Sequence, residues 1–171
     1  MSAGLWIAAA IVGALGTAAC YWAMWHAKGG VPALRALDAD FQCLDMLFRY
    51  TPEQAFASFD NAGPQGKGLL RRFWLTDFGF IASFGLVMLV VTHNTGVLAP
   101  LRHAMYALAC LRGAADTLEN LLLLRALGAY PQRRLTGTLK AASAATTLKW
   151  LLMGLWVAGL FINLIYRAAL L

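Results

Sequence analysis

Four side chains that could do chemistry lie close together in an otherwise apolar stretch of the sequence: Arg112, Asp116, Glu119 and Asn120. Their spacings of three, four and eight residues place them on one face of a helix. Ionisable groups in such a stretch usually face a bundle interior, where a carboxyl group can act as an acid or base or stabilise developing positive charge. The pattern predicts an interior site with two catalytic candidates, Glu119 and Asp116. Asn120 and Arg112 are candidates for ligand binding.

Residues of the other apolar stretches are candidates for the same site. Asp77 is the third catalytic candidate, and Lys149 and Tyr106 are further ligand-binding candidates. Asp77 and Lys149 are expected near the cytoplasmic side, toward which the stripe also extends, so these groups could converge. Purely structural roles for Arg112 and Lys149 stay open. Arg112 precedes Asp116 by four residues, the spacing of an intrahelical ion pair. Lys149 could pair with Asp77 or extend its amine to the interface.

Metal and cofactor chemistry finds little support. His93 and His103 flank a short outer loop, but a metal site needs three or four protein ligands, and the sequence supplies no others nearby. The motifs G-x-S-x-G and H-E-x-x-H and a glycine-rich phosphate loop are missing, so hydrolase, zinc-protease and nucleotide-driven functions lack support. Cys20, Cys43 and Cys110 form no C-x-x-C pair and are expected to be packing residues. We therefore expect no cofactor and no metal.

Apolar helices long enough to cross a bilayer must position the polar stripe. The 171 residues are 60% hydrophobic and only 13% charged, with a mean hydropathy of +0.63, whereas soluble domains are about 25% charged. A membrane span needs about 20 predominantly apolar residues. Four segments qualify: 5–25, 73–91, 98–126 and 147–166. The sequence predicts an all-α fold, a polytopic bundle of four transmembrane helices in a single membrane domain over residues 1–171.

The basic residues predict the orientation of these helices. They gather in the first and third loops, whereas the opposite side has only Arg102 and Arg167. By the positive-inside rule, the first and third loops are cytoplasmic and both termini lie outside the inner membrane. No basic residue precedes Leu5, which argues against a cleaved signal peptide. Aromatic residues near the cytoplasmic ends of three spans are expected to form an interfacial belt: Tyr21, Trp22, Trp25, Trp74 and Trp150.

The first loop, residues 27–72, is long enough to hold helices of its own. Apolar residues recur in it at helical spacing, which predicts an amphipathic helix that lies at the interface or caps the bundle. These residues are Leu34, Leu37, Phe41, Leu44 and Phe48. Thr51, Pro52 and Gln54 predict the start of another helix, with Thr51 as the N-cap and Gln54 completing a capping box. That short helix should end near residues 61–64, where glycine and proline follow each other.

Several short strings resemble a pattern found in small, uncharacterised bacterial four-helix membrane proteins. They are Y-T-P-E-Q-A at residues 50–55, the glycines near residues 63–67, D-F at 77–78 and A-D-T-L-E-N at 115–120. The resemblance covers about residues 37–124, and the chain departs from it after Asp77, where G-F-I replaces F-P-x-x-Y. No activity is attached to that family. The resemblance therefore implies the topology and the choice of Asp77, Asp116, Glu119 and Asn120 as site residues.

Three classes of function remain open. The first is a membrane protein that binds or chemically transforms a lipid or another hydrophobic small molecule at the carboxylates, and it is our preferred hypothesis. The second is a small proton- or cation-coupled transporter, and the third is a structural or accessory subunit in which the stripe only fixes helix register. Membrane lipids are the expected partners, and a homo-oligomer stays open. The net charge of +6 is explained by attraction to anionic headgroups, so no nucleic-acid partner is expected.

Overall fold

The computed structural model describes residues 2–95 and 98–169 of the chain. Of these residues, 85% are helical and none lies in a strand, which confirms the prediction of an all-helical fold. The elements are α1 (Ala3–Trp25), α2 (Val31–Leu37), the short 3₁₀ turn η1 (Leu44–Met46), α3 (Pro52–Thr95), α4 (Ala99–Ala129) and α5 (Thr136–Ala168).

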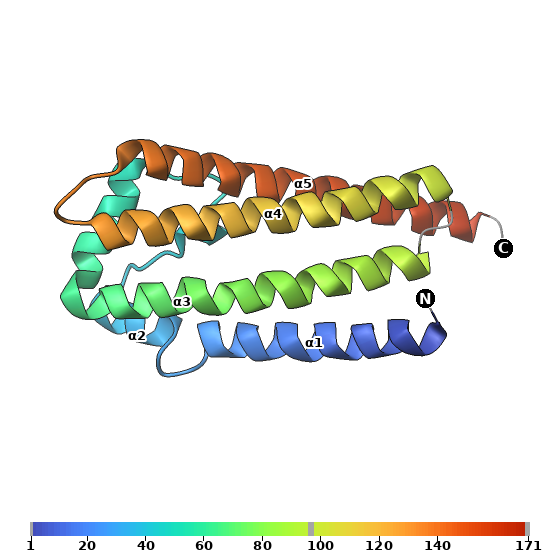
Figure 1. Ribbon diagram of the computed structural model, residues 1–171, viewed down its shortest axis with the longest axis horizontal. Coiled ribbons are helices and arrows are strands. Elements are labelled where there is room, and N and C mark those ends of the chain that lie inside the picture. Colours follow the sequence, from blue (N-terminus) through green and yellow to red (C-terminus); the bar gives the residue numbers. More distant parts are fainter. Residues whose placement is uncertain (1, 96–97, 170–171) are drawn as a thin grey trace.

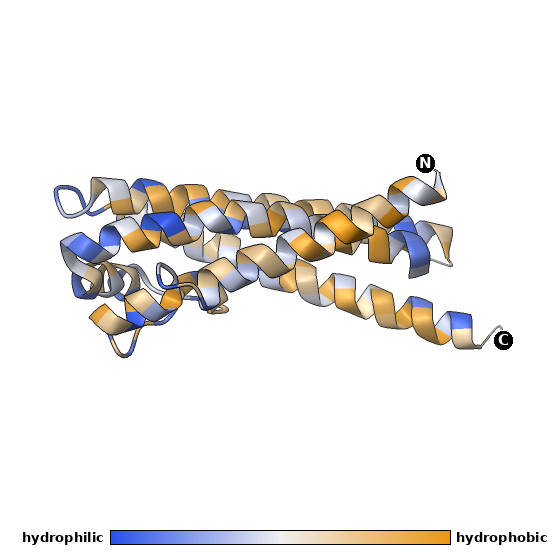
Figure 2. Ribbon diagram, turned by 90° about the horizontal axis from the view of Figure 1, so that it is seen from below, coloured by the Kyte–Doolittle hydropathy of each residue, from blue (hydrophilic) through white to orange (hydrophobic). Residues whose placement is uncertain are grey.

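The long helices lie side by side, so that α1 packs on α3, α3 on α4, and α4 on α5. Both ends of the chain lie at one end of the molecule, and α2 and the longer connections lie at the other (Figure 1). Among the described residues, three helices are long and apolar enough to cross a membrane: α1, α3 and α5. Figure 2 shows mostly pale or orange ribbon along the long helices, with blue gathered chiefly toward the two ends. The predicted third span forms α4, which carries the polar stripe.

The predicted capping box at the start of α3 is confirmed. The backbone N–H of Gln54 donates to the Thr51 hydroxyl at 3.2 Å, and the Thr51 N–H donates to the Gln54 side-chain oxygen at 2.8 Å. Two N–H groups that have no partner inside the helix are thereby satisfied. The predicted break near residues 61–64 occurs at Gly63, whose φ of 62° favours glycine, and the helix resumes at Pro64. Gly63 therefore divides α3 into a short first part and a long second part.

The predicted amphipathic helix over residues 34–48 is wrong. The α2 helix ends at Leu37, Asp38 is extended, and only η1 interrupts the irregular chain before α3. The Asp38 carboxylate accepts a hydrogen bond from the Asp40 N–H at 3.2 Å and another from the Asn61 side chain at 3.0 Å. Such local bonds from aspartate compete with helix formation. We call residues 38–51 the strap, because this segment runs from α2, which packs on α3, to α5, to which Phe48 and Tyr50 are hydrogen-bonded.

The core at the connecting end is built from aromatic rings. Phe59 makes edge contacts with Trp74 and Tyr130, with ring centroids 6.3 Å and 5.7 Å apart. Trp74 is only 2% exposed, so its predicted place in an interfacial belt is wrong. Tyr21 and Trp22 are exposed, as residues of such a belt would be. Trp74 was misassigned because the helix before Gly63 folds back over it and buries the ring against Phe59.

Small residues allow α1 and α3 to approach closely. A β-carbon added at Gly16 would stand 2.8 Å from Ser83 Cβ, and one added at Gly13 would stand 3.2 Å from the Ser83 carbonyl oxygen. A β-carbon at Gly79 would stand 2.9 Å from the Cys20 sulfur. Real β-carbons essentially never approach other atoms as closely as those added at Gly16 and Gly79 would, and the contact at Gly13 would be tighter than usual. Glycine at these three positions therefore lets the helices approach closely.

A disulfide would test this contact. In Gly79→Cys, the new β-carbon would lie 2.9 Å from the Cys20 sulfur. In a disulfide with an S–S bond of about 2.05 Å, the β-carbon of one cysteine lies at about this distance from the sulfur of the other. Mild oxidation should remove two hydrogens from the intact mass and protect Cys20 from maleimide, while the exposed Cys110 still reacts. The matched variant Gly85→Cys, whose β-carbon meets nothing within 4 Å, should leave Cys20 reactive. Equal labelling of Cys20 in both variants would contradict the packing of α1 on α3.

Candidate functional site

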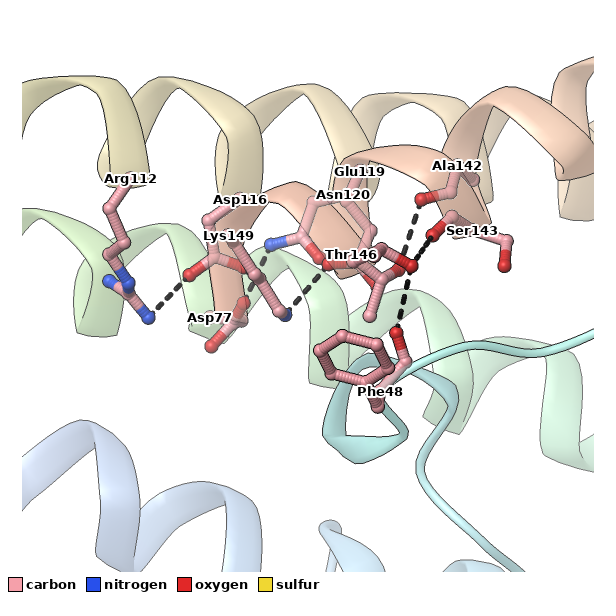
Figure 3. Close-up of polar contacts among 11 residues, drawn as sticks. Phe48, Asp77, Arg112, Asp116, Glu119, Asn120, Ala142, Ser143, Thr146 and Lys149 are labelled. Atoms are coloured by element: carbon pink, nitrogen blue, oxygen red, sulfur yellow. Dashed lines mark hydrogen bonds and ion pairs between the residues drawn. The ribbon is translucent and has the colours of Figure 1, made fainter. Parts of the chain in front are cut away.

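The polar stripe of α4 meets a lysine of α5 in a buried network of ion pairs (Figure 3). Arg112 Nη2 lies 2.7 Å from Asp116 Oδ2, and Lys149 Nζ lies 2.9 Å from Asp116 Oδ1. Lys149 Nζ also lies 2.7 Å from Glu119 Oε2, and the Thr146 hydroxyl donates to Glu119 Oε1 at 2.6 Å. Charged groups removed from water require such partners. The two carboxylates of the stripe are therefore both engaged by Lys149.

A second buried contact brings α3 to the stripe. Asn120 Nδ2 donates to Asp77 Oδ2 at 2.7 Å. This contact joins α3 to α4, as the predicted convergence requires, although α3 departs from the expected pattern just after Asp77. The intrahelical pair of Arg112 with Asp116 is confirmed. The suggested pairing of Lys149 with Asp77 is wrong, because the buried amine reaches the carboxylates of α4 instead.

Tyr106 does not belong to this site. It lies ten residues before Asp116 on α4, or about 15 Å along the helix at 1.5 Å per residue. Its hydroxyl lies 3.3 Å from His93 Nδ1 near the end of α3. The prediction failed because Tyr106 shares a side of α4 with the stripe but lies at another depth. Among the residues that the structure describes, no group of three or more His, Cys, Asp and Glu side chains could hold a metal ion.

The strap supplies a residue that sequence reasoning missed. Asp45 follows Leu44 in η1 and is 5% exposed, and its Oδ1 atom has no hydrogen-bond partner in the described part of the chain. Burial is the main cause that raises the pKa of Asp45 to about 7, while the nearby Lys149 acts in the opposite direction. The available signal was a single acidic residue inside the apolar run from Phe41 to Phe48. The helical pattern predicted over these residues would instead place Asp45 on a different face from the apolar side chains.

Hydrogen bonds from α5 hold the strap in place. The Ser143 hydroxyl donates to the Tyr50 carbonyl at 2.7 Å and accepts from the Tyr50 N–H at 3.1 Å. One turn further along α5, the Thr147 hydroxyl donates to the Phe48 carbonyl at 2.9 Å. These side chains satisfy backbone groups that have no partner in a helix or sheet. They fix the position at which Asp45 enters the interior.

A cavity of about 250 Å³ opens where the strap, α3, α4 and α5 meet. Its charged wall is formed by Asp45, Asp77, Arg112, Asp116 and Lys149. Its apolar wall is formed by Met46, Phe80, Phe84, Trp150 and Met153. Glu119 and Asn120 are fully buried behind the charged wall. The arrangement can receive a molecule with one charged or polar end and one apolar end.

No protein-family model, curated protein or solved structure matches the chain. The membership suggested by the resemblance to small bacterial four-helix membrane proteins therefore stays a prediction.

Proposed function

We propose that the chain is a multi-pass protein of the inner membrane in which α1, the part of α3 after Gly63, α4 and α5 each cross the bilayer. The pattern on α4 supports its inclusion. Leu111, Leu118 and Leu121 point outward and are 55%, 49% and 53% exposed, whereas Arg112 and Asp116 are buried. A polar interior and an apolar exterior suit a helix surrounded by lipid. In this topology the strap is cytoplasmic and both termini are outside, as the basic residues predict.

The function that we infer is the binding of a lipid or another hydrophobic small molecule in the cavity between α3, α4 and α5. The observation that carries this proposal is that one cavity joins an aromatic and methionine wall to a wall of buried charges. The two helices that flank it, α3 and α5, make few contacts with each other, so an amphiphile can approach between them from the membrane. If the bound molecule is also transformed, Asp45 and Asp77 are the best candidates for proton exchange, because Lys149 already pairs with both other carboxylates.

The packing beyond the cavity favours binding over transport. A cluster of apolar side chains fills the space between the cavity and the outer end of the helices: Met88, Met105, Ala109 and Trp156. All four are buried. A transporter needs access to its site from both membrane faces, and this cluster would have to separate to provide a route outward.

Mass spectrometry of co-purifying molecules tests the binding proposal. In Met153→Trp, the larger side chain should fill part of the cavity and reduce the amount of a retained amphiphile by about tenfold or more, as loss of about 1.4 kcal/mol of affinity would. The control is Leu151→Trp on the outer face of α5, where the native side chain is 53% exposed. It should retain the amphiphile at the level of the unmodified protein.

Both variants must first be shown to be folded, by gel filtration in mild detergent, because overpacking can destabilise a core. A profile of bulk membrane lipid that is the same in all three proteins would contradict the proposal. The accessory-subunit hypothesis would then gain support.

A further inference from the structure

The charges around the cavity do not balance. Both buried cations are engaged by the carboxylates of α4: Arg112 by Asp116, and Lys149 by Asp116 and Glu119. Two further carboxyl groups line the cavity, Asp45 and Asp77. Neither has a cation within ion-pair distance among the described residues. The wall that faces the cavity is therefore more acidic than basic.

The two surplus carboxyl groups differ in how well they are satisfied. Asp77 accepts one hydrogen bond, from Asn120 at 2.7 Å. Asp45 is 5% exposed, and its buried Oδ1 has no hydrogen-bond partner within residues 2–95 and 98–169. A buried acceptor without a partner costs free energy, and a ligand that donates a hydrogen bond or brings a positive charge would remove that cost. The Oδ1 atom of Asp45 is thus an acceptor in the lining of a cavity, and the described residues supply no donor for it.

The apolar residues that line the same cavity suit a cation that carries apolar groups. Phe80 and Trp150 present aromatic rings, and Met46 and Met153 present polarisable thioethers. Two rings of this lining already lie near the protein's own cations, because the Arg112 guanidinium carbon is 5.2 Å from the Phe84 centroid and Lys149 Nζ is 6.0 Å from the Trp150 centroid. Aromatic faces attract ammonium groups most strongly where water is excluded. The two walls together would contact a positive nitrogen and the carbon atoms attached to it.

A bare metal ion fits these features less well. No group of three or more carboxyl, imidazole or thiol side chains within the described part of the chain could hold one. The cavity, at about 250 Å³, has room for an organic headgroup and the start of its chain. Two donor groups in the lining of the cavity also indicate what kind of atom lies beside the nitrogen of the ligand. Arg112 Nη1 and Trp150 Nε1 are buried donors that find no hydrogen-bond partner among the residues described, so they could bind a hydroxyl or ester oxygen next to the nitrogen.

We propose that the ligand of this cavity is a hydrophobic amine or quaternary ammonium compound, whose positive nitrogen faces Asp45 and Asp77 and whose apolar part lies against Phe80, Trp150 and Met153. This inference rests on the proposed binding function and adds the charge of the ligand to it.

Binding of three probes with the same ten-carbon chain tests the proposal. They are decyltrimethylammonium, decanol and decanoate, and their affinities for the full-length protein in maltoside micelles can be measured through tryptophan fluorescence and native mass spectrometry. The cationic probe should bind about 10- to 100-fold more tightly than decanol, the range expected for one or two interactions with charged groups. Decanoate should bind most weakly.

Variants assign the preference to the two carboxyl groups. Asp45→Asn and Asp77→Asn should each reduce the preference for the cationic probe, and the double variant should remove most of it while the affinity for decanol stays unchanged. The matched control is Asp40→Asn, which changes an exposed aspartate of the same strap. It should leave all three affinities unchanged. Because the Asp45 carboxyl group forms no ion pair among the described residues, Asp45→Asn should fold even if Asp77→Asn does not.

The possible failures are distinguishable. Equal affinities for the three probes, or tighter binding of decanoate, would overturn the ammonium proposal and leave the binding function standing, provided that Met153→Trp weakens binding. A preference for the cation that survives the double variant would overturn the roles of Asp45 and Asp77. If no probe binds and Met153→Trp has no effect, both the ammonium proposal and the binding function fail.

Discussion

Replacing Lys149 by methionine is expected to lower the free energy of unfolding by about 3–5 kcal/mol, the usual cost of removing one partner from a buried ion pair. Lys149 is 5% exposed and holds both Asp116 and Glu119. Without its amine, Asp116 keeps Arg112, but Glu119 keeps only the hydroxyl of Thr146. Unfolding in mixed detergent micelles, followed by tryptophan fluorescence, measures the change.

Two controls separate the ion pairs from the loss of a lysine side chain. Lys140→Met removes an exposed lysine from the same helix and should have no measurable effect on stability. Adding Glu119→Gln to Lys149→Met should recover a large part of the loss, because the uncompensated carboxylate is then absent. A loss of less than about 1 kcal/mol in Lys149→Met would mean that this network contributes little to the fold.

Ser143→Ala is expected to release the strap and to lower the free energy of unfolding by about 2–5 kcal/mol, because each buried polar group left unsatisfied costs about 1–3 kcal/mol. The Ser143 hydroxyl satisfies both the N–H and the carbonyl of Tyr50. Its loss leaves both groups without their partner, and water can reach them only if the strap moves. Hydrogen exchange of the amides between residues 39 and 50 should accelerate, together with the loss of stability.

Ser58 provides the matched control. Its hydroxyl is buried and has no hydrogen-bond partner among the residues that the structure describes, so Ser58→Ala removes a polar group that contributes no such bond. The stability should stay the same or rise slightly, and exchange in the strap should not change. Equal exchange rates in Ser143→Ala and the unmodified protein would show that other contacts hold the strap.

Features with a short-range physical cause could be predicted from the sequence. The capping box at Thr51 and Gln54 depends on four consecutive residues, and the break at Gly63 depends on the conformational freedom of glycine next to proline. The ion pair of Arg112 with Asp116 follows from one turn of helix. The apolar helices follow from composition over about 20 residues. Each of these can be judged within a short stretch of chain.

Contacts between distant segments were the features that the sequence could not settle. Asp45 enters the interior because Tyr50 is bonded to Ser143, which lies 93 residues away. The partner of Lys149 depends on how α5 is rotated against α4, and this rotation decides between Asp77 and the carboxylates of α4. Leu34, Phe41 and Leu44 are all buried, as their spacing predicted, but they do not belong to one helix. The helix ends just before Asp38, whose side chain accepts hydrogen bonds that compete with helix formation.

The partnership of α4 and α5 has a consequence for the biogenesis of the proposed topology. Insertion of a helix with charged residues near its centre is unfavourable by about 2.5–3.5 kcal/mol for each arginine or aspartate, and α4 carries Arg112, Asp116 and Glu119 there. The amine that compensates two of these groups belongs to Lys149, which the ribosome makes later. We therefore expect α4 to remain at the translocon until α5 has been made, and the two helices to enter the bilayer together. In that helical hairpin the charged groups are paired before they are exposed to lipid.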